Sequence, residues 1–481
     1  MKINAITNIQ NNFGRNRTNF KNAPAKNNAV IAPNTVNNDK TKERNKKLYY
    51  GMGIAAVCIG AGYLITRGKT PSKIKSDGTL LGDLSEYMQT KLSPDALKSV
   101  MTKKEFLSEI STLKPENYVA SQENIEKGIF CADLHSHTNY SDGKGTVAEI
   151  LNGVANYADK LYAKAKRKFI FAITDHNGVE GVKQALVLIA KEPDKYKNVR
   201  FVTGAEMGFV MKCQQGSAKH NRYHNPTECS EVLAYCFNPF SKNVNEYFKN
   251  LHAKKDNAFL GVAKEVQGIY KDVSLSKSEA EAFSDGKNLS SLLNTHWTIF
   301  NYAQLKHRAV ELSKEQKKPV EHFVNMIKDN KLENPHLFDE YLKAQHIETK
   351  TQKIDKNIEQ ICQKYFPKVE NEQIISPTEN TFEELVQMFK AEDGTVMGFA
   401  HPAFFVENMT QENASRVIGE FIDKSGGMLC LSEKYHQAYD KAFKCNEMTQ
   451  DFVNYSNDVI DNFHLLSIGG RDNHTSSFLP N

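Results

Sequence analysis

From residue 129 onward, short apolar runs alternate with longer amphipathic stretches. The apolar runs predict strands, and stretches 146–165 and 178–191, with apolar residues every three or four positions, predict helices. Alternation of strands and helices predicts an α/β fold with a parallel sheet. The strands expected from these runs are 129–134, 169–174, 199–205, 395–400, 428–431 and 465–470.

Most of these predicted strands run into histidine, aspartate or glutamate. Such residues at the carboxyl ends of many strands are typical of the active site of a (β/α) barrel. In an extended segment, side chains two positions apart point to the same side, so His135 and His137 form a pair, as do Asp472 and His474. The strand-end residues are Asp133, His135, His137, Asp175, His176, Glu206, His401, Glu433, Asp472 and His474.

These residue types indicate a metal centre. Imidazoles mixed with carboxylates, without cysteine, suit Zn²⁺, Mn²⁺ or Fe²⁺, and the carboxylates favour Mn²⁺. About eight donors exceed one tetrahedral site, so two or three metals sharing a carboxylate are expected. Clustered metals are a common means of hydrolysing phosphate esters with a metal-activated water. The sequence contains no GxGxxG, GxxxxGK[ST] or GxSxG motif, so a nucleotide cofactor and a serine nucleophile lack support.

Five motifs in this order resemble those of the PHP (polymerase and histidinol phosphatase) family. They are DLHSHTNYSDG from Asp133, ITDHN from Ile173, GAE at Glu206, AHP at His401 and GGRDNH ending at His474. The resemblance covers residues 129–481. It implies a distorted seven-stranded (β/α) barrel, three divalent metals and phosphoesterase activity.

The resemblance also implies how the ligands divide among the metals. His135, His137, Glu206 and Asp472 would hold the first metal. Glu206 and His401 would share the second. Asp142, His176 and His474 would hold the third. Mn²⁺ is the first expectation, with Zn²⁺ or Fe²⁺ as alternatives.

The presence of a carboxylate at Asp142, seven residues after His135, resembles the pattern of one branch of the family. That branch contains nucleoside 3′,5′-bisphosphate phosphatases and 5′→3′ oligonucleotide exonucleases, so a small phosphorylated substrate or short oligonucleotide is expected and no protein partner is implied. Two alternatives are a histidinol-phosphate-type phosphatase and a non-catalytic module of the same family.

The chain departs from the family pattern at three positions. Glu231 opens a strand where the family has histidine, so we expect it to bind the second metal, with His220 and His224 as alternative ligands. Asn294 stands where an arginine is usual, in a long helical insertion at 239–393. Arg471 stands where a small residue is usual, and would either clamp substrate phosphate or pair with a nearby carboxylate. The expected catalytic residues are Asp133, Asp175, Arg471 and His296, the last as a phosphate contact.

The N-terminal quarter has a different character. Residues 1–47 are basic and rich in asparagine, which predicts a disordered tail. From Leu48 to Ile65 the chain has eighteen uncharged residues, about 27 Å of helix, which predicts a single-pass membrane anchor rather than a buried helix or a cleaved signal peptide. A linker and amphipathic helices are expected at 66–128, with a helix start at Ser93-Pro94.

Composition adds little to this picture. The 481 residues include 62 Lys and Arg against 57 Asp and Glu, and this net charge of +5 is too weak to indicate nucleic-acid binding by itself. The eight cysteines contain no CxxC pair, which predicts free thiols in a reducing compartment. We therefore expect a membrane-anchored enzyme; basic residues on both sides of the anchor leave its orientation open, and the free cysteines favour the cytoplasmic side for the catalytic domain.

Overall fold

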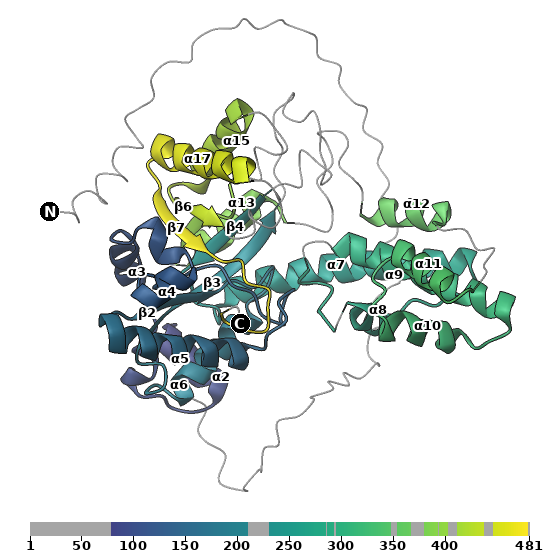
Figure 1. Cartoon of the computed structure of the whole chain (residues 1–481), viewed down its shortest axis with the longest axis horizontal. Helices are drawn as coiled ribbons and strands as arrows, with labels where there is room; N and C mark the ends of the chain where they lie inside the picture. Colours follow the sequence, from purple (N-terminus) through teal and green to yellow (C-terminus); the bar gives the residue numbers. More distant parts are fainter. Residues whose placement is uncertain are drawn as a thin grey trace, which may run out of the picture. The chain divides into compact units, whose positions relative to one another are not determined.

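Seven strands form one sheet that nearly closes into a barrel (Figure 1). The computed structural model describes residues 78–209, 230–284, 286–292, 295–347, 354–366, 380–392, 394–402, 411–436 and 446–479. The strands lie in the sheet in the order in which they occur along the chain. They are β1 (Ala132–Asp133), β2 (Phe169–Ile173), β3 (Val199–Phe209), β4 (Ser230–Tyr235), β5 (Val396–Phe399), β6 (Leu429–His436) and β7 (Leu466–Gly470).

The last strand returns to the first. The Leu134 amide donates to the Gly469 carbonyl at 3.2 Å, and the His137 amide donates to Asn473 at 3.0 Å. Gly470 permits this approach, because a Cβ on it would lie 2.4 Å from the His135 backbone nitrogen. Closure therefore brings the segment after β7 against the segment after β1, where both predicted ligand pairs lie.

The sheet is not fully parallel, which corrects the expectation from the strand–helix alternation. β4 runs antiparallel to both β3 and β5, while the other neighbouring strands pair in parallel. Glu231 pairs with Gly208 near the end of β3, and its carbonyl accepts from the Ala400 amide just after β5. The reversal thus places the beginning of β4 beside the carboxyl ends of its neighbours.

Side chains alternate between the inside and the outside of the barrel. Ala132, Leu134, Ile170 and Ala172 belong to an inner core that also contains Phe106, from outside the sheet. The outer faces pack in a larger core with surrounding helices. These helices are α5 (Val147–Ala165), α6 (Glu180–Lys191), α13 (Phe382–Lys390), α15 (Gln411–Ser425) and α17 (Asn446–Phe463).

Local signals in the sequence explain where several helices begin. Thr146 caps α5 in a capping box with Glu149, which satisfies free amides of the first turn. The expected helix start at Ser93-Pro94 gives only a 3₁₀ turn, because Val100 then pairs with Phe201 of β3. The N-terminal elements are α2 (Leu80–Met88), η1 (Pro94–Leu97), α3 (Lys103–Ile110), η2 (Pro115–Tyr118) and α4 (Gln122–Lys127).

The predicted insertion between β4 and β5 is helical. It begins with a long helix, α7, which contributes Leu251 to the outer barrel core and Val262 to a separate core within the insertion. Figure 1 shows the neighbouring helices gathered around α9, which contacts α7, α8, α10, α11 and α12. The helices are α7 (Lys242–Ile269), α8 (Lys277–Phe283), α9 (Thr295–Gln316), α10 (Val320–Asp329), α11 (Pro335–Ala344) and α12 (Lys356–Tyr365).

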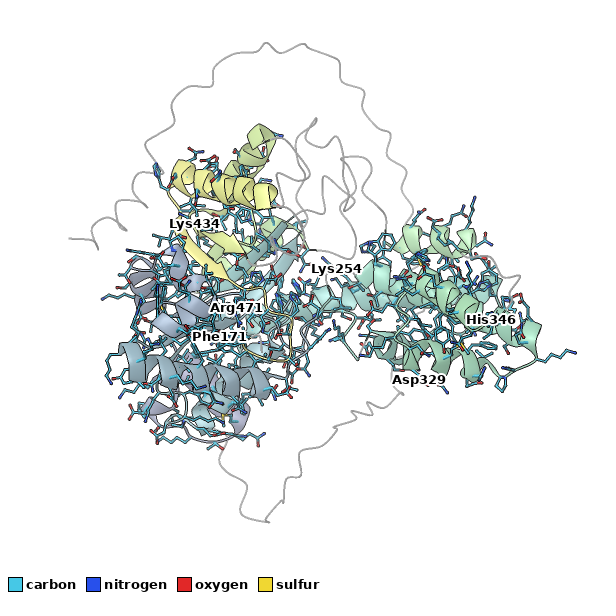
Figure 2. All side chains as sticks on the ribbon, in the orientation of Figure 1. Phe171, Lys254, Asp329, His346, Lys434 and Arg471 are labelled. Carbon is cyan, nitrogen blue, oxygen red and sulfur yellow. The ribbon has the colours of Figure 1, made fainter. Side chains whose placement is uncertain are left out.

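In its described residues, the insertion holds one buried histidine among exposed ones. His307 is buried, with its ring 4.4 Å from that of Tyr270. His322, His336 and His346 are exposed, and Figure 2 labels His346 at the surface of the insertion.

The structure also corrects the membrane-bound localisation. Among the described helices, none is both long and apolar enough to cross a bilayer. The segment 48–65, on which that localisation depended, lies outside the described residues.

Candidate metal centre

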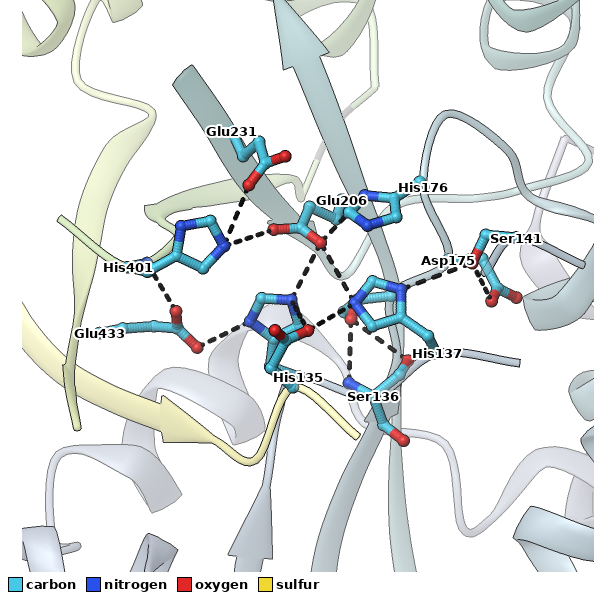
Figure 3. A network of polar contacts seen from close by, with 12 residues as sticks. His135, Ser136, His137, Ser141, Asp175, His176, Glu206, Glu231, His401 and Glu433 are labelled. Carbon is cyan, nitrogen blue, oxygen red and sulfur yellow. Dashed lines mark hydrogen bonds and ion pairs between the residues drawn. The ribbon is translucent and has the colours of Figure 1, made fainter. Parts of the chain in front are cut away.

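All nine predicted metal ligands come together at one end of the barrel. Figure 3 labels six of them: His135, His137, His176, Glu206, Glu231 and His401. Eight of them fall into three overlapping groups, in each of which the potential ligand atoms lie within 4.8 Å of one another. His401 joins them through contacts with two of the carboxylates. The groups are His135, His137, Glu206 and Asp472; His137, Asp142, His176 and His474; and His176, Glu206 and Glu231.

The first group has the spacing of a compact metal site. His135 Nε2 lies 2.9 Å from a Glu206 oxygen and 3.4 Å from Asp472. His137 Nε2 lies 3.2 Å and 3.0 Å from the same two carboxylates. Donors bound about 2.0–2.1 Å from a tetrahedral metal are about 3.3–3.4 Å apart. The four side chains therefore fit one shared ion.

Glu433, on β6, fixes the orientation of His135. One of its oxygens lies 2.9 Å from His135 Nδ1, and the other accepts the His401 amide at 2.7 Å. A proton on Nδ1 leaves Nε2 with a bare lone pair facing the oxygens of Glu206 and Asp472. Burial acts to lower the pKa of metal-free His135, but Glu206 and Glu433 raise it well above its usual range, so a bound metal ion would take the place of a proton shared between Nε2 and Glu206.

Two more buried nitrogens support the same conclusion. Neither His137 Nε2 nor His176 Nδ1 makes a hydrogen bond, although each lies near a carboxylate. Buried polar atoms without partners are rare in folded proteins. Bound metal ions would use these lone pairs, so the residues present fit divalent metal ions.

Glu206 is shared by the groups. One oxygen lies 3.1 Å from His176 Nδ1 and also contacts His135 and His137, while the other lies 3.2 Å from His401 Nε2. The carboxylate is fully buried. Burial acts to raise its pKa, but the surrounding imidazoles hold the pKa well below its usual range.

Glu231 occupies the position predicted for a ligand of the second metal. Its carboxylate lies 3.0 Å from His401 Nε2 and shares a group with Glu206 and His176. The alternative ligands, His220 and His224, lie outside the described residues. The antiparallel direction of β4 explains how a residue at the start of a strand reaches this end of the barrel.

The remaining predicted ligands lie around Asp142. His474 Nε2 is 3.1 Å and His176 Nε2 3.5 Å from one oxygen of this carboxylate. His137 Nδ1 is 3.6 Å from the other oxygen. Burial acts to raise the pKa of Asp142, but His176 and the other imidazoles lower it further. Asp142 is therefore an anionic side chain surrounded by imidazole nitrogens.

Asp175 supports the loop that carries Asp142. Its carboxylate accepts from the Thr138 amide at 2.6 Å and from the Ser141 hydroxyl at 3.0 Å. Burial raises the pKa of Asp175. A Cβ on Gly181 would lie 1.9 Å from this carboxylate, so a glycine is needed there. The structure thus gives Asp175 a positioning contact, while its predicted catalytic role stays a prediction.

Asp133 and Arg471 pair with each other. The Arg471 Nε donates to Asp133 at 2.7 Å, the Arg471 amide donates to it at 3.0 Å, and both side chains are buried. The guanidinium carbon lies 4.5 Å from the Phe478 ring centroid. Of the two arrangements expected for Arg471, the structure shows the carboxylate pair, and neither residue belongs to the three ligand groups.

The insertion reaches the loop before Asp142. Lys287 Nζ donates to the Asp142 carbonyl at 2.9 Å, and the Ser291 hydroxyl donates to the Tyr140 carbonyl at 3.0 Å. His296, in the first turn of α9, is half-buried beside Trp297, and Asn294 lies outside the described residues. The phosphate contact of His296 stays a prediction.

Sequence reasoning assigned no role to two side chains of the site. Glu433 ends a predicted strand in the same pattern as the ligands, and this signal could have identified it as a supporting carboxylate. Lys287 lies in a loop without any motif, and only the fold brings it to Asp142.

We expect metal binding at pH 7.5 to release protons. Burial acts to lower the pKa of metal-free His137, but Asp472 and Glu206 outweigh it and raise the pKa to about 10. A metal must displace that proton, so apparent affinity should rise about tenfold per pH unit for each proton released. Calorimetry of Mn²⁺ binding in two buffers with different ionisation enthalpies measures this release, with His336→Ala as a surface control. Affinity that is constant from pH 6.5 to 8.5 would contradict the expectation.

Comparison with known proteins gives only distant likenesses. No protein-family profile and no curated protein matches the chain. A protein of Bifidobacterium adolescentis, provisionally named a metal-dependent phosphoesterase, is similar in structure at 17% identity and a TM-score of 0.38, over 73% of this chain and 89% of its own. An amidohydrolase from Chromobacterium violaceum, with bound sulfate and no metal, is similar at 15% identity and a TM-score of 0.35, over 72% of this chain and 87% of its own. At these values the likenesses leave the family of the chain open.

Proposed function

We propose that this protein is a metal-dependent phosphoesterase. The observation that supports the proposal is the convergence of nine imidazole and carboxylate side chains on one another, with the buried Glu206 in contact with four imidazoles. A set this large suits more than one divalent ion, and clustered ions are suited to phosphate-ester hydrolysis. Three ions, with Mn²⁺ before Zn²⁺ or Fe²⁺, remain part of the proposal.

The metals would supply Lewis acidity and an acidified water. The protein's own residues orient the donors: Glu433 holds His135, and Asp175 holds the loop of Asp142. Lys287 adds a positive charge beside that loop, where it can bind a phosphoryl oxygen of the substrate. His296 is proposed as a second phosphate contact.

The substrate class rests on the resemblance to the PHP family. The carboxylate at Asp142 favours nucleotide-type phosphate esters or short oligonucleotides over a histidinol-phosphate-type substrate. A non-catalytic module is less well supported, because the described residues retain every predicted ligand in one place.

Metal removal and replacement tests the proposal. The full chain, stripped with a chelator and reloaded with Mn²⁺, Zn²⁺ or Fe²⁺, is assayed with 4-nitrophenyl phosphate, adenosine 5′-monophosphate and a 5′-phosphorylated trinucleotide. We expect phosphate release to be lost on chelation and restored by at least one metal, with Mn²⁺ the best. 4-Nitrophenyl acetate serves as the control for non-phosphate esters. A metal-loaded chain that hydrolyses none of the phosphate esters would refute the proposal.

A further inference from the structure

One helix belongs to both the barrel and the insertion. The first half of α7 places Val244, Phe248 and Leu251 in the outer barrel core. Its second half places Phe259 and Val266 in the core of the insertion. Because a continuous helix is stiff, the middle of α7 has a fixed position relative to both cores.

His252 lies in that middle part, immediately after Leu251. Its Nε2 is 2.8 Å from the backbone carbonyl of Asn177, and the side chain is half-buried. Burial lowers the pKa of His252, although the bond to Asn177 opposes this. The imidazole is therefore neutral at pH 7, and its Nε2–H donates to the carbonyl.

Asn177 directly follows His176, one of the candidate ligands. Its φ angle is +47°, a left-handed conformation that is uncommon for residues other than glycine. The Asn177 amide donates to the Glu206 carbonyl at 2.8 Å, and its side-chain oxygen accepts from Gly208 at 3.2 Å. His252 thus adds a side-chain bond to a residue that already links the segments carrying His176 and Glu206.

We propose that His252 is a positioning residue for the metal centre, which fixes the ligand His176 through the Asn177 carbonyl. The insertion then lies next to the metal centre and also contributes to the affinity of the centre for metal. This inference rests on the metal centre of the proposed function, but not on the identity of the substrate.

Removing the donor should loosen the His176 side of the centre. In His252→Leu the Asn177 carbonyl loses its side-chain donor, and we expect affinity for the most weakly bound metal to fall about 10–100-fold, as is typical for outer-shell partners. In His252→Gln the side-chain amide can reach a position similar to that of Nε2, so most of the affinity should return.

The test measures metal binding in the full chain. Co²⁺ is titrated into metal-free protein, and its visible absorption reports the coordination while calorimetry reports affinity and stoichiometry. His307→Leu is the matched control, because His307 is a buried histidine of the same insertion whose ring lies 4.4 Å from that of Tyr270. We expect a changed Co²⁺ spectrum for His252→Leu, a wild-type spectrum for His307→Leu and partial or full recovery for His252→Gln.

Two results would overturn the proposal. The first is wild-type Co²⁺ affinity and spectrum in His252→Leu, even if its stability falls. The second is the same loss of affinity in His307→Leu, which would indicate general loosening of the insertion. Neither readout needs phosphate hydrolysis, so a correct metal result with an inactive enzyme would refute the proposed function alone.

Discussion

The Glu206→Gln variant is expected to lose metal and to hydrolyse phosphate esters at least about 10³-fold more slowly than the wild type. The wild-type carboxylate lies within 3.2 Å of four imidazole nitrogens and has no exposed surface. Glutamine has the same shape but carries no charge, and its amide group presents hydrogens where a metal needs lone pairs. One substitution thus affects all sites that share this carboxylate.

Elemental analysis and kcat on the same preparation measure this effect. Circular dichroism should show that the secondary structure of Glu206→Gln is unchanged. Glu126→Gln, at an exposed position on α4, is the matched control and should keep its metal and activity. Retention of the full metal content together with more than a tenth of the wild-type kcat would contradict the shared role of Glu206.

The sequence predicted the strands and the gathering of polar side chains at their ends for a specific physical reason. Interior strands such as β2 are buried on both faces, so they read as continuous apolar runs. A polar residue directly after such a run marks the strand end, and the barrel gathers these ends in one place. His135, His176 and Asp472 were therefore identifiable before their contacts were known.

The features that the sequence did not predict depend on long-range pairing. No local sequence signal gives the direction of β4, because an apolar run looks the same in a parallel and in an antiparallel strand. Only the pairing of β4 with β3 and β5 shows the reversal. The contact of Lys287 with Asp142 joins residues 145 positions apart. Likewise, the sequence could not decide between the two expected roles of Arg471, since Phe478 and Asp133 meet it only in the folded barrel.

The Asp133–Arg471 pair should affect the free energy of unfolding more than the rate of phosphate-ester hydrolysis. Asp133→Ala would leave the buried guanidinium without its carboxylate, which is expected to lower the free energy of unfolding by about 3–5 kcal/mol. Replacing both partners by apolar residues removes the unpaired charge, so Asp133→Leu combined with Arg471→Met should recover part of that loss, although the backbone amide of residue 471 still loses its acceptor. Chemical denaturation of the full chain measures both effects. Asp194→Ala, at an exposed position, is the control and should change stability by less than about 0.5 kcal/mol.

Activity separates this structural role from the predicted catalytic one. If Asp133 and Arg471 only stabilise the folded structure, the metal donors of the double variant are unchanged. The folded double variant should then keep kcat within about threefold of the wild-type value. A catalytic Arg471 would instead stabilise charge that develops in the transition state, and its loss would lower kcat by about 10²-fold or more at full stability. A stable double variant with its full metal content and that loss of kcat would restore the catalytic role predicted from the sequence. We expect kcat to be retained, because the Arg471 guanidinium is hydrogen-bonded to Asp133 and lies against the Phe478 ring.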